Sequence, residues 1–456
     1  MKLVYGVKDK PSFGKTLVFA LQQLLAILAA TIAVPAIIGN GMSQSAALFG
    51  AGVGTIVYLL FTKFRSPVFL GSSFAFLGSM AAAFAGGVSA SAGYLGMIIG
   101  AVMAGLVYVV IALIVKFAGV KWISKLMPAV VIGPTVAIIG LSLSGNAIGD
   151  AVGVAKDGSA FVMNAHAGVC LICALVTLAV TMLCSVFGKK MMKMIPFIIG
   201  IVSGYIVASI FTIIGNNTGI DAMKIIDYSA FSNLRWVPSF TFETAFSGGY
   251  DFGDAGSIAS YIGTIAAAYV PVAFVVFAEH IADHKNISTI IEHDLLEDPG
   301  LHRTLLGDGV GSMVGAFFGG CPNTTYGESI GCVAISGNAS VVTIFATAIL
   351  AIVASFFAPF VAFLASIPSC VMGGVCISLY GFIAVSGLKM IQDVDLGENR
   401  NLFIVSVILI AGVGGLVLKF GSVTITEVAC ALILGILTNL ILPEKKKADK
   451  DAKETK

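Results

Sequence analysis

A short run of acids and histidines ends one of the long apolar stretches of this chain. On a helix, Glu279 and Asp283 lie four residues apart and share one face, while His280 and His284 share the adjacent face. Carboxylates buried in an apolar segment can accept hydrogen bonds from a ligand, and carboxyl or imidazole groups can carry a proton. We therefore predict that Glu279 binds a ligand and that Glu279, Asp283 or His284 takes part in proton coupling.

Two other interpretations of this run stay open. Histidines four residues apart beside acids can ligate a metal, but the segment is not His-Glu-x-x-His and shows no third ligand, so an intramembrane metalloenzyme is a remote alternative. The helix end can also simply emerge into cytoplasmic water, which suits Asp283 and His284 better than Glu279. We expect no metal, no cofactor other than a coupling proton, and no enzyme activity.

A second candidate acid, Glu328, lies in the polar segment Pro322–Gly331 between apolar runs. Such an interrupted span is stable only where protein or a water-filled cavity satisfies its backbone N–H and C=O groups. An isolated carboxyl group at this depth is a candidate both for ligand binding and for proton coupling. Asp308, in Gly307-Asp308-Gly309, is interpreted instead as a carboxylate at a helix start.

The elements that position these residues follow from composition. With 58% hydrophobic and 11% charged residues in 456, the chain is an all-α polytopic membrane protein. The 53 glycines would let its helices pack closely. We predict fourteen spans, near 15–39, 46–62, 68–86, 93–118, 127–145, 165–188, 193–215, 258–284, 304–320, 323–338, 341–363, 369–388, 401–418 and 424–443.

The distribution of basic residues predicts the orientation. With both termini in the cytoplasm, only four of the 26 basic residues fall outside: Lys156, Lys224, Arg235 and Lys419. We therefore expect a multi-pass protein of the cell (inner) membrane, in contact with lipid, whose first apolar run is retained as a span. A net charge of +2, with basic residues spread over membrane flanks, argues against nucleic-acid binding.

The longest polar interval divides the chain into two sets of seven spans. An odd number of spans in each set gives the two halves inverted topology if they are related. The predicted organisation is a cytoplasmic N-terminal tail (1–14), a first seven-span repeat (15–215), an extracytoplasmic linker (216–257), a second repeat (258–443) and a disordered cytoplasmic tail (444–456).

One weak internal match supports related halves. Ser72–Phe76 in the third span corresponds in residue type, until its last position, to Thr324–Glu328 in the tenth. Hydroxyl, aromatic and small residues together favour a short extended segment over a continuous helix. We predict two short antiparallel strands meeting near the midplane, each leading into a half-helix whose N-terminus offers N–H groups to a polar ligand.

Four motifs resemble a known family: Gly71–Phe76, Ala278-Glu279-His280, Asn323–Glu328 and Leu379-Tyr380-Gly381. Together they are similar to the bacterial uracil permeases, uracil–proton symporters of the nucleobase/ascorbate transporter (nucleobase:cation symporter-2) family. The resemblance covers nearly the whole chain, and NTTYGE in this setting is a specific signal. It implies a seven-plus-seven inverted repeat divided into core and gate domains. Members often work as dimers, which leaves a homodimer open.

The resemblance also implies the substrate contacts. It makes Glu279 a direct ligand of the base and Glu328 the partner carboxylate on the tenth span, with aromatic side chains that line the pocket and small residues that offer backbone groups. Uracil suits such a site because carboxylates can accept from its two N–H groups, backbone N–H groups can donate to its carbonyls, and an aromatic face can stack on the ring. The expected function is a proton-coupled uracil importer working by alternating access. The implied site residues are Glu279, Glu328, Phe74, Tyr326, Tyr380 on the gate-side wall, Ala75 and Gly327.

Several positions depart from the family pattern. Asp283 stands where members often carry histidine, and Gln23 where many have histidine. Ser329 and Ser336 alter the signature of the tenth span, which leaves a xanthine or other purine permease as an alternative. An anion exchanger of the same architecture is a further alternative, although it would favour a site without paired acids.

Overall fold

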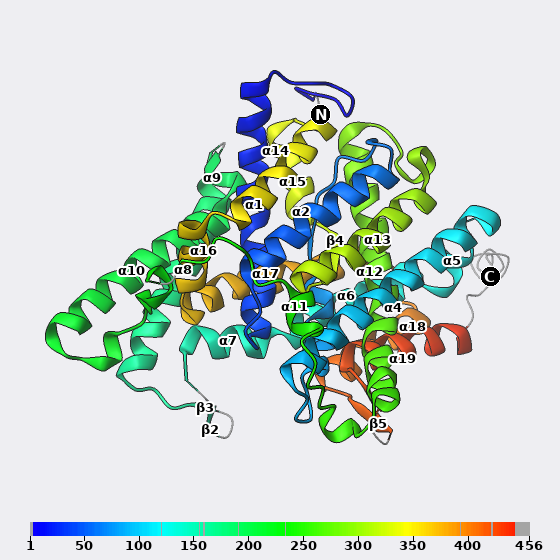
Figure 1. Cartoon of the computed structure of the whole chain (residues 1–456). Coiled ribbons are helices and arrows are strands. Elements are labelled where there is room, and N and C mark those ends of the chain that lie inside the picture. Colours follow the sequence, from blue (N-terminus) through cyan, green and yellow to red (C-terminus); the bar gives the residue numbers. More distant parts are fainter. Residues whose placement is uncertain are drawn as a thin grey trace.

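The computed structural model describes residues 3–119, 121–154, 156–157, 160–189, 191–232, 234–392, 394–420 and 423–442. Most of these residues are helical (Figure 1). In the described ranges, eight helices are long and apolar enough to cross a membrane, or nine if one bent helix pair counts as a single span. The chain is therefore a helical, multi-pass membrane protein. The count of fourteen spans and the inverted repeat stay predictions.

The predicted spans coincide with helices or, in the third and tenth, with a strand followed by a short helix. In the first half, the elements are α1 (Phe13–Ile38), α2 (Gln44–Phe61), β1 (Leu70–Ser72), the 3-10 turn η1 (Phe74–Phe76), α3 (Leu77–Ala83), α4 (Ala90–Ala118), α5 (Lys121–Leu126), α6 (Ala129–Ser142), α7 (Ser144–Val152), β2 (Lys156–Asp157), β3 (Ala160–Phe161), α8 (Ala165–Phe187), α9 (Met191–Met194) and α10 (Pro196–Thr218).

The polar linker contains only short elements before the second half begins. These are η2 (Asp221–Met223), η3 (Tyr228–Phe231), α11 (Thr241–Ala245) and η4 (Gly253–Ala255). The second half contains α12 (Ile258–Ile291), η5 (Leu296–Gly300), α13 (Leu301–Gly319), β4 (Asn323–Thr325), α14 (Gly327–Ser336), α15 (Val341–Ser355), α16 (Ala358–Ser366), α17 (Ser369–Met390), α18 (Asn399–Val413), β5 (Leu418–Phe420), β6 (Val423–Ile425) and α19 (Glu427–Ile441).

Strands β1 and β4 pair antiparallel, which confirms the predicted strand pair. Gly71 lies opposite Thr324, and backbone bonds continue the pairing on either side, from Ser73 N to the Pro322 carbonyl (2.9 Å) and from Tyr326 N to the Phe69 carbonyl (3.2 Å). Strand β1 ends earlier than predicted because the chain turns into η1 after Ser73.

Glycines let the two helices beside this sheet approach closely. A Cβ on Gly50 of α2 would lie 2.4 Å from the carbonyl oxygen of Gly315 of α13, and one on Gly54 would lie 2.7 Å from that of Gly311. Small residues four apart on both helices allow such backbone contact in a membrane protein. Asn323 fills the space beside them and donates a hydrogen bond to the Gly50 carbonyl (3.2 Å). The expected packing role of glycine is confirmed at these positions.

The helices pack in two groups. The first comprises α1, α2, α4 and α12–α15, and the second comprises α6–α8, α10 and α17–α19. Figure 1 shows α1 running beside α14 and α15, and α8 with α10 at the side of the molecule away from α13. The boundary between the two groups passes close to the β1–β4 sheet.

The N-terminal segment is bound to the first group. Val4 N donates to the Gly337 carbonyl (2.8 Å), Ala339 N to the Tyr5 carbonyl (2.9 Å), and Val341 N to the Val7 carbonyl (3.1 Å). The beginning of the predicted N-terminal tail is therefore hydrogen-bonded to the segment that connects α14 to α15. The predicted disordered tail, 444–456, lies outside the described residues.

Candidate functional site

A cavity of about 390 Å³ lies between the two helix groups. Its volume is within the range of small-molecule binding sites. The first group contributes polar groups from β1, α12, β4 and α14, whereas the second contributes a mainly apolar wall. This wall includes Val136, Ile139, Phe197, Leu379, Phe382 and Ile383.

Three acidic side chains line the cavity. Glu279 and Asp283 come from α12, and Glu328 comes from the first turn of α14. The Thr325 hydroxyl donates to Asp283 Oδ2 at 2.6 Å. Among the described residues, no lysine or arginine forms an ion pair with Glu279 or Glu328. Because both glutamates lack a cationic partner, they can accept hydrogen bonds from a ligand.

Two short helices begin at the cavity. Phe74 and Ala75 of η1, which leads into α3, line it, as do Gly327 and Glu328 at the start of α14. The first N–H groups of a helix have no intrahelical carbonyl partner and carry partial positive charge. A Cβ added to Gly327 would meet no atom within 4 Å, so the backbone there is open toward the cavity.

Tyr326 is held rigidly in the cavity wall. Its hydroxyl donates to the Ser72 carbonyl at 2.9 Å. Its ring lies against Gly71, where an added Cβ would be 2.3 Å from the ring carbons. Because its hydroxyl is already bonded to β1, Tyr326 presents an aromatic surface to the cavity and holds no spare O–H for a ligand.

Helix α1 fixes the start of α14 from the other side. Gln23 Nε2 donates to the Ser329 carbonyl at 3.1 Å and also contacts Ser329 Oγ, which accepts a hydrogen bond from Phe69 N at 3.3 Å. Neither Ser329 nor Ser336, whose hydroxyl accepts from Asn338 N, is among the cavity-lining residues. Two of the sequence departures, Gln23 and Ser329, are thus bonded partners that position Glu328.

Two predicted site residues lie outside the cavity lining. Tyr380, only 2% exposed, packs edge-on against Phe74 with ring centroids 5.8 Å apart, one layer behind the wall. Helix α12 continues to Ile291, and His284 is fully buried on the adjacent face, against Tyr58 of α2. The alternative in which His284 emerges into cytoplasmic water is therefore wrong.

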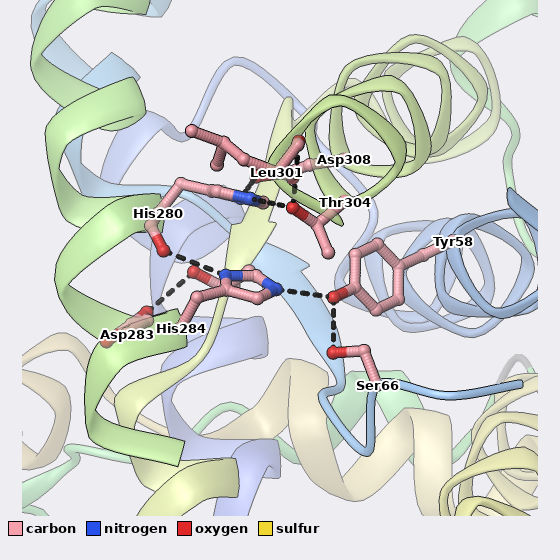
Figure 2. Close-up of polar contacts among 9 residues, drawn as sticks. Tyr58, Ser66, His280, Asp283, His284, Leu301, Thr304 and Asp308 are labelled. Atoms are coloured by element: carbon pink, nitrogen blue, oxygen red, sulfur yellow. Dashed lines mark hydrogen bonds and ion pairs between the residues drawn. The ribbon is translucent and has the colours of Figure 1, made fainter. Parts of the chain in front are cut away.

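Figure 2 shows the buried polar network around His284. Its Nδ1 donates to the His280 carbonyl at 2.8 Å, and its Nε2 lies 2.7 Å from the Tyr58 hydroxyl, which is 2.6 Å from Ser66 Oγ. Every polar atom of the imidazole therefore has a partner. This network ties α12 to α2 and to the chain that follows it.

Asp308 belongs to the same buried region, so its interpretation as a helix-start carboxylate is wrong. Helix α13 begins at Leu301, and Asp308 lies two turns inside it with no exposed surface. Its Oδ2 is 2.7 Å from His280 Nδ1 (Figure 2). The sequence feature that could have indicated this buried position is a lone acid between two glycines in an apolar run.

The described residues contain no group of three or more His, Cys, Asp or Glu side chains arranged to hold a metal ion. His280 and His284 stack with ring centroids 4.0 Å apart, but each binds its own set of protein partners. All four ring nitrogens are thus bonded to protein groups.

The profile of the permease family matches residues 14–419. This chain belongs to that family. The chain is 42% identical to the uracil permease of Bacillus caldolyticus over 98% of its own length and 96% of the relative's. It is 38% identical to the Bacillus subtilis (strain 168) uracil permease, covering 99% and 98% of the two chains. The Escherichia coli (strain K12) uracil permease is 34% identical, with 96% and 93% covered.

Solved structures show where this permease fold recurs. The transmembrane domain of the cyanobacterial bicarbonate transporter BicA has a TM-score of 0.60 at 16% identity, with 95% of this chain and 99% of that one covered. The murine anion transporter Solute Carrier 26 family member A9, inward-facing, has a TM-score of 0.62 at 11% identity, covering 95% and 69%. At these identities the likeness concerns the fold alone.

Family membership makes this permease a transporter and not an enzyme. The metalloenzyme alternative is thereby set aside. A solute bound in the cavity between the two helix groups would contact both groups at once.

Proposed function

We propose that this permease imports uracil together with protons by alternating access. The observation that carries the proposal is the convergence of Glu279 and Glu328, neither with a cationic partner among the described residues, on one cavity at the start of two short helices. The full-length similarity to uracil permeases supports the choice of substrate.

The cavity matches the chemistry of a small planar base. Glu279 and Glu328 accept from the two ring N–H groups, and the N–H groups at the starts of η1 and α14 donate to the two carbonyls. Phe74 and Tyr326 provide aromatic surfaces. A site that satisfies every edge of uracil rejects analogues that leave a buried group unpaired.

Proton coupling is assigned to the acids of this site. Glu279, Asp283 and Glu328 come together without an ion-paired lysine or arginine among the described residues, so mutual repulsion and desolvation favour binding of a proton at one of them. Coupled groups share such a proton, and the cavity acids are best treated as one titrating unit. His284, predicted as a fourth candidate, does not line the cavity.

Alternating access requires two bodies that move against each other. We assign the first helix group as the core domain and the second as the gate domain. The paired strands β1 and β4, at corresponding places in the two halves, support an inverted seven-plus-seven repeat. Fourteen spans, an inner-membrane location with cytoplasmic termini, and a homodimer complete the proposal.

Anion exchange is less favoured by the cavity. Its lining contains three carboxyl groups and one lysine, Lys193, so an anion would enter a field of net negative charge. A purine permease is also less favoured, because Ser329 and Ser336, which kept it open, do not line the cavity.

The test is uptake of radiolabelled uracil into proteoliposomes. Uptake should rise with an inward proton gradient and fall when a protonophore collapses that gradient. Unlabelled xanthine, hypoxanthine and bicarbonate at equal excess should compete less than unlabelled uracil. Uptake that ignores the gradient would contradict proton coupling, and stronger competition by xanthine or bicarbonate would contradict the substrate assignment.

A further inference from the structure

Hydrogen bonds around His280 assign one of its two ring protons. Thr304 Oγ1 lies 3.0 Å from the Leu301 carbonyl and 3.0 Å from His280 Nε2. A carbonyl only accepts, so the single proton of the Thr304 hydroxyl goes to Leu301. The hydroxyl oxygen must then accept from the imidazole. His280 Nε2 therefore carries a hydrogen.

The other ring nitrogen shares a proton with Asp308. His280 Nδ1 and Asp308 Oδ2 are 2.7 Å apart, a distance that requires one hydrogen between them. If the hydrogen is on nitrogen, the pair is imidazolium and carboxylate; if it is on oxygen, the pair is neutral imidazole and carboxylic acid. Either way, the pair has no net charge and holds one proton that can dissociate.

Burial places that proton on Asp308. Both side chains are inaccessible to solvent, and Asp308 Oδ1 has no hydrogen-bond partner within the described part of the chain. A bare carboxylate oxygen in a protein interior is more costly than the carbonyl oxygen of a neutral acid. Asp308 is therefore a carboxylic acid that donates to His280.

The groups facing this pair connect it to the cavity. Its neighbours on the packed elements are Tyr58 of α2, Tyr108 of α4, and Glu279, Asp283 and His284 of α12. When Asp308 is ionised, its negative charge acts on both Glu279 and Asp283, which line the cavity on the adjacent face of α12. A negative charge on Asp308 therefore opposes negative charge on the cavity acids.

We propose that Asp308 and His280 form a second proton-binding site of the transporter, behind the cavity, which releases and regains its proton during transport. The inference rests on the proposed function. Release leaves an Asp308 carboxylate facing a neutral His280, so the pair changes from zero to one negative charge. Each release and uptake changes the charge felt by Glu279 and Asp283, which couples the pair to ligand binding across α12.

The first test is Asp308→Asn. An asparagine amide donates to His280 Nδ1 as the protonated acid does, but it has no proton to release. We expect uracil binding in detergent and uracil counterflow to persist. Net accumulation under an inward gradient of about one pH unit should fall about tenfold, the amount that one carried proton supplies. Asp294→Asn, an exposed acid in the loop after α12, is the matched control and should accumulate like wild type.

Three results of this test are informative. Wild-type accumulation in Asp308→Asn would overturn the proposal and make the pair structural. Loss of binding in folded Asp308→Asn would also overturn it, because the residue would then act on the ligand site itself. Failure of the wild-type protein to bind uracil would overturn the proposed function instead, which distinguishes the two failures.

Thr304 provides a second, milder test. Thr304→Val removes the acceptor of His280 Nε2–H without changing either member of the pair. We expect the pH of half-maximal gradient-driven uptake to shift in Thr304→Val and to return toward the wild-type value in Thr304→Ser, which keeps the hydroxyl. An unshifted profile in Thr304→Val would contradict a titrating pair, even if Asp308→Asn does not fold.

Discussion

Two faces of the same helix, α12, carry neighbouring residues with opposite surroundings. Glu279 and Asp283 line the cavity, and Glu279 has no lysine or arginine partner among the described residues. His280 and His284, each one position later, are fully buried, and each binds protein groups through both ring nitrogens. A step of one residue along the helix therefore separates acids that face the cavity from histidines whose ring nitrogens are bonded within the protein.

The difference shows how a membrane protein manages polar groups in one segment. Buried polar groups with partners stabilise a specific packing, here of α12 against α2 and α13. Buried polar groups without partners carry an energetic cost that a ligand relieves on binding. Loss of a cavity acid should therefore affect ligand binding first, and loss of a partner of His284, such as the Tyr58 hydroxyl, should affect stability first.

The largest effect is expected on the cavity face, from Glu279→Gln. The substitution removes a charged acceptor and introduces an amide donor facing a ligand N–H, so uracil binding should weaken by about 2–3 kcal/mol, roughly 30- to 150-fold in Kd. Calorimetry in detergent measures the change. Glu297→Gln, an exposed acid beyond α12, is the control and should bind like wild type. Unchanged affinity in Glu279→Gln would remove the contrast between the two faces.

A comparable effect is expected in the strand pair that positions the cavity. In Gly71→Ala, the new Cβ would lie 2.3 Å from the Tyr326 ring, which its bond to Ser72 holds in place, so we expect a loss of about 1–3 kcal/mol of stability together with loss of uptake. Gly78→Ala, in α3, meets no atom within 4 Å and should be neutral or slightly stabilising. Thermal unfolding and uptake distinguish the two. Equal stability and uptake in both variants would show that the strand pair accommodates the added methyl group at little cost.

On the histidine face, Tyr58→Phe should lower stability without weakening uracil binding. The variant leaves His284 Nε2 and Ser66 Oγ without their shared partner, at a cost of about 1–3 kcal/mol. Tyr228→Phe, at an exposed tyrosine of the linker, serves as control. Thermal unfolding and calorimetry on the same samples separate stability from affinity. A large loss of affinity in Tyr58→Phe would mean that both faces of α12 contribute to the ligand site.

The smallest effect is expected outside both faces, at the exposed pair of Arg65 and Asp298 in the loop before α13. The hydrogen bond and charge of Arg65 lower the pKa of Asp298. A lowered pKa stabilises the folded protein at pH values above the ordinary pKa of aspartate. This stabilisation is lost as the pH falls through the lowered pKa. Asp298→Asn should therefore unfold at a slightly lower temperature than wild type at neutral pH, and the gap should close in acid. A gap independent of pH would mean that the charge is not responsible.

Much of the architecture was predictable because local chemistry dictates it. Long apolar runs must be helices in lipid, since each backbone N–H and C=O needs a partner. The segment around Thr324 is rich in hydroxyl and aromatic residues and does not read as a continuous apolar helix. This composition correctly predicted the pairing of β1 with β4. The spacing of Glu279 and Asp283 likewise predicted their common face, which the cavity confirms.

Other features escaped prediction because they depend on contacts between segments far apart in the chain. Gln23 and Ser329 looked like separate departures from a family pattern, yet they are bonded across 306 positions. Tyr380 was expected on the cavity wall, but α17 is oriented so that Leu379 and Phe382 line the cavity and Tyr380 packs behind Phe74. Asp308 looked like a helix cap, because no local signal shows that helix α13 starts two turns earlier and packs its acid against His280.

The amino-acid sequence by itself determined the class of the protein, the approximate positions of its helices, the interrupted segments and the acids most suited to bind a ligand. Hydrophobic length, backbone satisfaction and residue spacing act within a few turns of chain, so they can be evaluated locally. Only the tertiary structure decided which polar groups remain unpaired. That outcome depends on which distant helix supplies a partner: α13 supplies one to His280, while Glu279 on the cavity wall has no lysine or arginine partner among the described residues.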